Sequence, residues 1–362
     1  MERGRPLEGL AMTGYRGKRV FVTGHTGFKG AWLTQILLES GAEVCGYALQ
    51  PPTRPSLFEL LSLSEHCRSV TGDIRNLDAL TKAMADFRPE IVFHLAAQPL
   101  VIDSYENPVY TYETNVMGTV YLLEATRKCG SVRSIVNVTT DKVYQNNEWV
   151  YGYRESDALN GHDPYSNSKS CSELVTDSYK KSFFNAEGIA VSTVRAGNVV
   201  GGGDFSMNRI VPDCYRAVTE GKPVIVRNPN SIRPYQHVLE PLFVYLIIGE
   251  KQLRENAVSG CYNVGPSDAD CVNTLEIANL YKRFNPDLSI CIADTVNTSR
   301  HEATLLRLDC SKLRVSLGLV PLWKIDVAIE KTVELYNVVS QQTDIREVMS
   351  RQIREYESLM VC

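Results

Sequence analysis

The chain has 362 residues, of which 44% are hydrophobic and 22% charged, so it can bury a large core and should hold about two domains. Its formal net charge of −4 excludes a generally basic binder of nucleic acids or membrane surfaces, and no apolar run reaches the length of a membrane span. The ten cysteines form no C-x-x-C pair, which favours a cytoplasmic protein with reduced thiols and no metal over a disulfide framework or a zinc site.

The N-terminal part is predicted to bind a dinucleotide. Residues 1–16 are rich in Gly, Arg and Glu, and we expect a flexible leader there, with Met12 as a possible start. The apolar run that follows ends in glycines at the spacing G-x-x-G-x-x-G, and then come apolar residues at helical spacing. This pattern predicts a strand, a tight turn and a helix whose N-terminus faces a pyrophosphate, although three glycines alone could simply form the turn. The cofactor-binding candidates here are Gly24, His25, Gly27, Phe28, Lys29 and Gly30.

Further strands and helices alternate from Gly17 onward, which predicts an α/β fold with a doubly wound parallel sheet of the Rossmann type. A smaller mixed α/β substrate domain is expected towards the C-terminus. The expected strands cover residues 43–49, 69–74, 91–97, 134–138 and 189–194, and the expected helices include 77–87 and 115–125.

Two strand ends offer additional cofactor contacts. Asp73 could face an adenine amine, although aspartate is equally typical of a turn or a helix cap. The acidic residue that usually holds the ribose hydroxyls is missing, because the second strand ends in Tyr-Ala-Leu-Gln-Pro. We therefore expect NAD to bind loosely, and NADP is the alternative if Arg54 meets a 2′-phosphate. The candidates at these strand ends are Asp73, Ile74, Leu95, Ala96 and Ala97, with Gln98 next to them as a substrate contact.

A tyrosine and a lysine supply the predicted chemistry. Tyr165 and Lys169 lie four residues apart, so on a helix they share one face. A nearby ammonium lowers the pKa of a tyrosine, and Tyr165 could then take a proton from a sugar hydroxyl while hydride leaves the same carbon. Thr140, at the end of the fifth strand, could share a hydrogen bond with that hydroxyl. An exposed helical pair is the alternative for this spacing alone.

Together these motifs resemble the extended short-chain dehydrogenase/reductases over essentially the whole chain from Gly17. The resemblance implies NAD as cofactor and adds Asn115, Thr139, Tyr165 and Lys169 to its contacts. Thr140-Asp141 is similar to the sugar-nucleotide 4,6-dehydratases, in which a glutamate normally follows the pair. Lys142 stands there instead, and with the segment 233–242 it most resembles the dehydratases that act on CDP-glucose for dideoxysugars of bacterial O-antigen lipopolysaccharide.

The same resemblance implies residue roles. Asp141 would be the acid that protonates the C6 hydroxyl, and Lys142 either the base at C5 or an electrostatic support for an enolate. A lysine must be neutral to act as a base, which requires burial or a nearby cation. The candidates for binding the substrate diphosphate are Asn198, Arg209, Arg233 and His301, whose alternative role is in surface salt bridges.

Domain limits and assembly complete the expectations. We assign residues 17–197 and 236–258 to a dinucleotide-binding domain, and 198–235 and 259–358 to a sugar-nucleotide domain. A homodimer or homotetramer is implied, paired through helices near residues 105–128 and 164–185. The alternatives are a dehydratase for dTDP-glucose or GDP-mannose, a 4-epimerase, or a dinucleotide sensor without catalysis.

Overall fold

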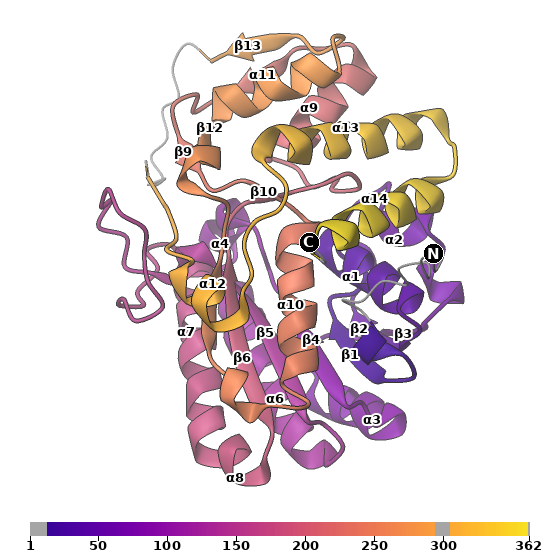
Figure 1. Ribbon diagram of the computed structural model, residues 1–362, viewed down its shortest axis with the longest axis vertical. Helices are drawn as coiled ribbons and strands as arrows, with labels where there is room; N and C mark the ends of the chain where they lie inside the picture. Colours follow the sequence, from indigo (N-terminus) through magenta and orange to yellow (C-terminus); the bar gives the residue numbers. More distant parts are fainter. Residues whose placement is uncertain (1–12, 294–304, 361–362) are drawn as a thin grey trace, which may run out of the picture.

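The centre of the molecule is a parallel sheet of seven strands in the order β11-β6-β5-β4-β1-β2-β3 (Figure 1). The structure, a computed structural model, describes residues 13–293 and 305–360. Because the chain starts in the middle of the sheet and winds outward in both directions, the predicted doubly wound α/β fold is confirmed. The strands are β1 (Arg19–Thr23), β2 (Glu43–Ala48), β3 (Arg68–Thr71), β4 (Ile91–His94), β5 (Ser134–Thr140), β6 (Ala190–Ala196) and β11 (Cys261–Val264).

Helices cover both faces of this sheet. Alternate strand residues point to opposite faces, so Val20 and Val22 of β1 join one core while Phe21 joins the other. The core that contains Val20 and Val22 packs against α1 (Phe28–Glu39) and α10 (Leu239–Lys251). The core on the opposite face of the sheet packs against α3 (Leu77–Phe87), α6 (Gly118–Cys129) and α7 (Pro164–Tyr179). α6 and α7 are each joined to a π-helical turn, Glu113–Met117 before α6 and Lys180–Phe184 after α7.

A smaller core apart from the main sheet, which we call the second core, is built by elements at the top of Figure 1. It is built by side chains such as Cys214, Tyr281 and Ala328, which come from three different helices. Its elements are α9 (Ile210–Glu220), α11 (Thr274–Phe284), α13 (Ile325–Gln341) and the paired strands β8 (Val224–Val226) and β13 (Ile290–Ile292). Two short pairs connect it to the main sheet, β7 (Val199–Val200) with β10 (Gln236–His237) and β9 (Ile232–Arg233) with β12 (Val272–Asn273).

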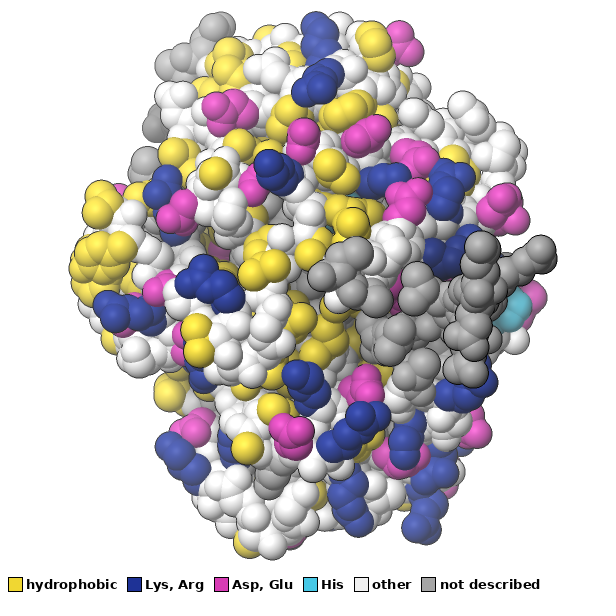
Figure 2. Space-filling view, viewed as in Figure 1, with side chains coloured by type: hydrophobic (Ala, Val, Ile, Leu, Met, Phe, Trp, Pro, Cys, Tyr) yellow, Lys and Arg dark blue, Asp and Glu magenta, His cyan; other side chains and the backbone are white. Residues whose placement is uncertain are grey.

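Charged side chains of both signs lie on the surface. Figure 2 shows Lys and Arg side chains interspersed with Asp and Glu over one face of the molecule. Within the part of the chain that the structure describes, no helix combines the length and apolarity needed to cross a membrane.

The remaining helices are α2 (Leu57–Leu60), α4 (Val101–Glu106), α5 (Pro108–Tyr112), α8 (Asn185–Glu187), α12 (Ser311–Leu317) and α14 (Ile345–Met360), with 3₁₀ turns at Thr13–Tyr15, Leu63–Glu65, Asp141–Val143, Asn256–Val258 and Asp268–Asp270.

The structure corrects three of the predicted domain limits. The segment 259–265, which we assigned to the sugar-nucleotide domain, contributes β11 to the main sheet, where it pairs with β6. α14 also leaves that domain, because its apolar side chains join the core around α1 and α10. Residues 13–16 are no flexible leader, since Tyr15 is fully buried and its hydroxyl donates to the Leu246 carbonyl at 2.6 Å. Residues 1–12, with Met12, lie outside the described residues.

A buried carboxylate on α10 fastens the C-terminal segment to the sheet. Glu240 accepts hydrogen bonds from the backbone N–H groups of Leu322 and Trp323, at 3.0 and 2.7 Å, and from the Tyr356 hydroxyl at 2.7 Å. Burial raises the pKa of Glu240 to about 7, although these three donors act in the opposite direction. The carboxylate therefore ionises in the folded protein only near neutral pH.

This raised pKa predicts a pH-dependent stability. The raised pKa of Glu240 contributes to the stability of the folded protein. This contribution is fully present below about pH 4.3, the pKa of an exposed carboxyl, and is lost as the pH rises to 7. The loss should amount to roughly 3 kcal/mol in the free energy of unfolding. Glu240→Gln keeps an oxygen acceptor but cannot ionise, so urea unfolding at pH 5 and pH 8 should show a smaller decrease for the variant than for the parent. Equal decreases in both proteins would contradict this assignment.

Candidate active site

A cleft of about 1320 Å³ lies where the carboxyl ends of the sheet strands face the second core. Single-ligand pockets are usually smaller than about 1,000 Å³, so the cleft has room for a dinucleotide and a second ligand of nucleotide size. In the described ranges 13–293 and 305–360, no three His, Cys, Asp or Glu side chains gather into a metal-binding group.

The glycine turn forms one wall of this cleft. Gly24 has φ +76°, and a Cβ there would lie 2.7 Å from the Ala96 backbone nitrogen. A Cβ on Gly30 would lie 2.1 Å from the Gly24 carbonyl oxygen, so α1 can approach the turn only without a side chain there. Gly27 is different, because its Cβ would meet nothing closer than 3.5 Å. It lines the cleft directly before the free N–H groups of α1, a cradle that fits a pyrophosphate.

The predicted strand-end residues also line the cleft. The Asp73 carboxylate is held by Arg75, whose guanidinium forms an ion pair with it at 2.8 Å. Hydrogen bonds from Arg75 lower the pKa of Asp73, so this carboxylate is ionised. The other predicted cofactor contacts from the glycine turn and the strand ends that line the cleft are Gly24, Gly27, Phe28, Lys29, Gly30, Ile74, Leu95, Ala96 and Ala97.

Three predicted contacts have side chains that are engaged elsewhere. The His25 ring is buried with its Nε2 atom 2.7 Å from Ser69 Oγ, and His25 is not among the residues that line the cleft. Asn115 binds both the backbone N–H and the carbonyl of Gln98. The Gln98 side chain in turn binds the backbone of Leu100 at both ends of its amide. Asn115 and Gln98 therefore shape the loop after β4, and the His25 ring packs away from the cleft.

Asp141 lies at the end of β5 as a buried carboxyl group with one unused oxygen. The Thr140 hydroxyl donates to Asp141 Oδ1 at 2.9 Å, whereas Oδ2 has no hydrogen-bond partner among the described residues. Burial raises the pKa of Asp141, and the positive charges of Lys142, Arg233 and Lys29 only partly oppose this effect. A protonated Asp141 would carry its proton on Oδ2, the oxygen that Thr140 leaves unoccupied.

Tyr165 and Lys169 face the same cleft from α7. Burial raises the pKa of Tyr165 to about 12, although a hydrogen bond with Thr140 lowers it. Lys169 donates to the Val138 carbonyl at 3.2 Å, and burial lowers its pKa to about 8 while Glu173 raises it. The predicted catalytic residues Thr140, Asp141, Lys142, Tyr165 and Lys169 are thus brought together.

Basic side chains also line the cleft. Arg209 forms an ion pair with the buried Asp204 at 3.1 Å, and Arg233 is 5% exposed. Asn198 lines the same cleft. Arg227 also lines it and was not predicted, because it follows a short strand with no distinctive motif. His301 lies outside the described residues.

Comparison with known proteins gives the family. The family described as GDP-mannose 4,6 dehydratase matches residues 21–334. The CDP-glucose 4,6-dehydratase of Salmonella typhimurium is 47% identical over 350 residues, which cover 95% of this chain and 97% of the relative. The chain belongs to the extended short-chain dehydrogenase/reductases.

Solved members of this family share the fold. The UDP-glucose 4-epimerase of Thermus thermophilus in complex with NAD has a TM-score of 0.76 at 24% identity, covering 88% of this chain and 99% of that one. The dTDP-glucose 4,6-dehydratase of Bacillus anthracis in complex with NAD has a TM-score of 0.73 at 19% identity, covering 91% and 100%. At these identities the similarity establishes the architecture of an extended short-chain dehydrogenase/reductase and no more.

The two glycines of the turn give a matched pair of variants. Gly30→Ala should lower the free energy of unfolding by about 1–3 kcal/mol, because its Cβ meets the Gly24 carbonyl. Gly27→Ala should leave unfolding within about 0.5 kcal/mol of the parent, yet weaken dinucleotide binding tenfold or more, because its methyl group occupies the space that a pyrophosphate needs. Urea unfolding and fluorescence titration with NAD separate the two effects. Unchanged NAD affinity in Gly27→Ala would contradict the proposed cradle.

Proposed function

We propose that the chain is a CDP-glucose 4,6-dehydratase, a lyase that converts CDP-glucose into CDP-4-keto-6-deoxyglucose and water with NAD as its cofactor. The observation that carries this proposal is the 47% identity to the Salmonella enzyme over nearly the full length of both chains. The local chemistry agrees with it, because Asp141 and Lys142 follow Thr140 next to Tyr165 and Lys169.

The glycine cradle and the neighbouring strand ends support NAD as the cofactor. NAD, when bound, supplies a hydride acceptor for C4, a hydride donor for C6 and a positively charged ring that favours the Tyr165 phenolate. Arg54, the candidate for a 2′-phosphate of NADP, is exposed and is not among the residues that line the cleft. β2 ends at Ala48 and is followed by Leu49 and Gln50, without a carboxylate for the ribose, which supports loose binding of NAD.

Tyr165 is the proposed base for the C4 hydroxyl. Its phenol is protonated in the ligand-free site, so a substrate proton can be taken only after nearby positive charge lowers its pKa. Lys169 supplies such a charge from one turn further along α7, and Thr140 orients the hydroxyls. Removal of this proton is required when hydride leaves C4.

Asp141 is the proposed acid at C6. Burial raises the pKa of Asp141 and so favours its acid form, and the Oδ2 atom is available to give a proton to the departing C6 hydroxyl. Lys142 lines the same cleft and either removes the C5 proton or stabilises the enolate that forms. The C6 hydroxyl leaves as water with the proton from Asp141, the hydride taken from C4 is delivered to C6, and C5 regains a proton, so the reaction has no net oxidation or reduction.

Three arginines are proposed to hold the substrate diphosphate, because a guanidinium can bind phosphate oxygens with two parallel hydrogen bonds. Arg209, Arg227 and Arg233 line the cleft, and so does Asn198. The second core would therefore bind the nucleotide and place the sugar at Asp141.

Location, pathway and assembly remain predictions. We infer a cytoplasmic enzyme that supplies a deoxysugar for O-antigen lipopolysaccharide. Exposed apolar side chains on α5, α7 and the adjoining π-helical turns, Val109, Met117, Leu174 and Phe183, support the expected homodimer or homotetramer.

A panel of substrates tests the function. Purified protein incubated with CDP-glucose, dTDP-glucose, UDP-glucose or GDP-mannose should form a 4-keto-6-deoxy sugar from CDP-glucose alone. Turnover should depend on added NAD, because the cofactor binds loosely. Product from another nucleotide sugar would reject the substrate but keep the reaction, whereas no product from any would favour an epimerase or a sensor.

Two substitutions distinguish the roles of Lys142. Lys142→Glu should lower kcat by about 10²-fold or more, because the substitution removes both the amine that could act as a base and the positive charge. Lys142→Arg keeps the charge but cannot lose its proton. Loss of turnover in both variants would identify Lys142 as the C5 base. Retained turnover in Lys142→Arg would instead indicate an electrostatic role. Near-normal kcat in Lys142→Glu would contradict either role.

A further inference from the structure

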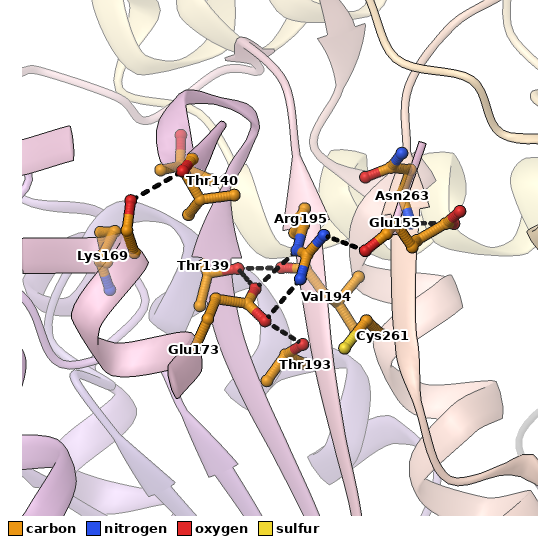
Figure 3. Close-up of polar contacts among 12 residues, drawn as sticks. Thr139, Thr140, Glu155, Lys169, Glu173, Thr193, Val194, Arg195, Cys261 and Asn263 are labelled. Carbon is orange, nitrogen blue, oxygen red and sulfur yellow. Dashed lines mark hydrogen bonds and ion pairs between the residues drawn. The ribbon is translucent and has the colours of Figure 1, made fainter. Parts of the chain in front are cut away.

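A fully buried ion pair lies behind the catalytic residues (Figure 3). Glu173 on α7 and Arg195 on β6 are each 2% exposed, and neither is used by the proposed chemistry. Arg195 Nε donates to Glu173 Oε1 and its second terminal nitrogen to Oε2, both at 3.0 Å. Sequence reasoning did not single out this pair, although Glu173 stands four residues after Lys169, the helical spacing that also links Tyr165 and Lys169.

Two threonines complete the hydrogen bonds of Glu173. Thr139 donates to Oε1 and Thr193 to Oε2, both at 2.5 Å, so each carboxylate oxygen accepts two bonds. Thr139 directly precedes Thr140, which shares its hydroxyl with Asp141. The carboxylate therefore fixes the end of β5 from behind the cleft.

The other end of the pair holds the segment that follows Lys142. Arg195 donates to the Tyr144 hydroxyl at 2.8 Å, and this hydroxyl donates to Asn263 Oδ1 at 2.6 Å. Asn263 belongs to β11, and its side-chain amide nitrogen donates to the Tyr153 carbonyl at 2.7 Å. Thr139 and Tyr144 thus anchor the chain on both sides of Asp141 and Lys142.

Stability alone does not explain this arrangement. Removing two charges from water costs free energy that offsets much of the attraction between them. Apolar residues of similar volume often stabilise a core equally well. What apolar residues could not do is accept the Thr139 hydroxyl, donate to Tyr144 and place a negative charge one turn from Lys169.

We propose that Glu173 and Arg195 are positioning residues for the dehydration: they fix the Thr139–Tyr144 segment that carries Asp141 and Lys142, and Glu173 keeps Lys169 protonated. This inference rests on the proposed function for its chemistry. The charge effect follows from what surrounds Lys169. Tyr165 shares its helix, and among the described residues the charge of Lys169 also acts on His94 of β4 and Lys29 of α1.

Of these neighbours, Glu173 supplies the negative charge. Burial lowers the pKa of His94 to about 3, so its imidazole is neutral, and Lys29 repels an ammonium. Glu173 raises the pKa of Lys169 against the effect of burial. Without that carboxylate, Lys169 should lose its proton closer to neutral pH.

Glu173→Gln and Tyr144→Phe separate the two effects. Glu173→Gln should move the alkaline limb of the kcat/KM profile for CDP-glucose about one pH unit lower. The pH at which NAD affinity declines should fall by the same amount, since Lys169 is a proposed NAD contact. Tyr144→Phe leaves the ion pair intact and should lower kcat roughly tenfold without moving either pH dependence, because only the anchor after Lys142 is lost.

The controls keep the test decisive. Urea unfolding identifies a variant that fails to fold, and Glu173→Asp, which keeps the negative charge on a side chain one methylene shorter, then replaces Glu173→Gln with a smaller shift in the same direction. Lower stability with unchanged kcat and unchanged pH dependences would overturn the proposal. If the parent protein does not convert CDP-glucose, the proposed function fails, and the pH dependence of NAD affinity still decides whether Glu173 controls Lys169.

Discussion

Burial of ionisable groups at the end of β5 is the constraint on which the site depends. The same loss of solvent raises the pKa of Asp141 and Tyr165 and lowers that of Lys169, because it disfavours the charged form of each. Burial thus favours the acid form of Asp141, while the pKa of Lys169, about 8, lies near neutral pH. Such opposed shifts in one cleft are typical of groups that exchange protons during catalysis.

The fold creates this burial by bringing distant segments together. The strand ends of a doubly wound sheet form the floor of the cleft, and the second core closes the side that carries the arginines. Glu240 ties the C-terminal segment to α10, and α14 adds apolar side chains to the core beneath the glycine turn. The part of the chain that we propose to bind the nucleotide is therefore fastened to the main sheet.

Local sequence patterns predicted the parts of this arrangement that depend on near neighbours. The glycine turn, the helix after it and the pair of Tyr165 and Lys169 could be predicted because their spacing determines their geometry. The edge position of β11 could not, because its partner β6 lies more than sixty residues earlier and a four-residue apolar run fits several sheets. The orientation of His25 and the hydrogen bonds of Gln98 depend on tertiary contacts with Ser69 and with the loop after β4, which no periodicity reveals.

The central claim is that this cleft moves a hydride within one sugar and removes water, and deuterium at C4 of CDP-glucose tests it most directly. The account predicts a 4-keto-6-deoxy product that carries the deuterium at C6, without dilution when unlabelled NADH is added, as measured by mass spectrometry and NMR. Deuterium retained at C4 in an epimerised sugar, or lost to the added NADH, would contradict the account.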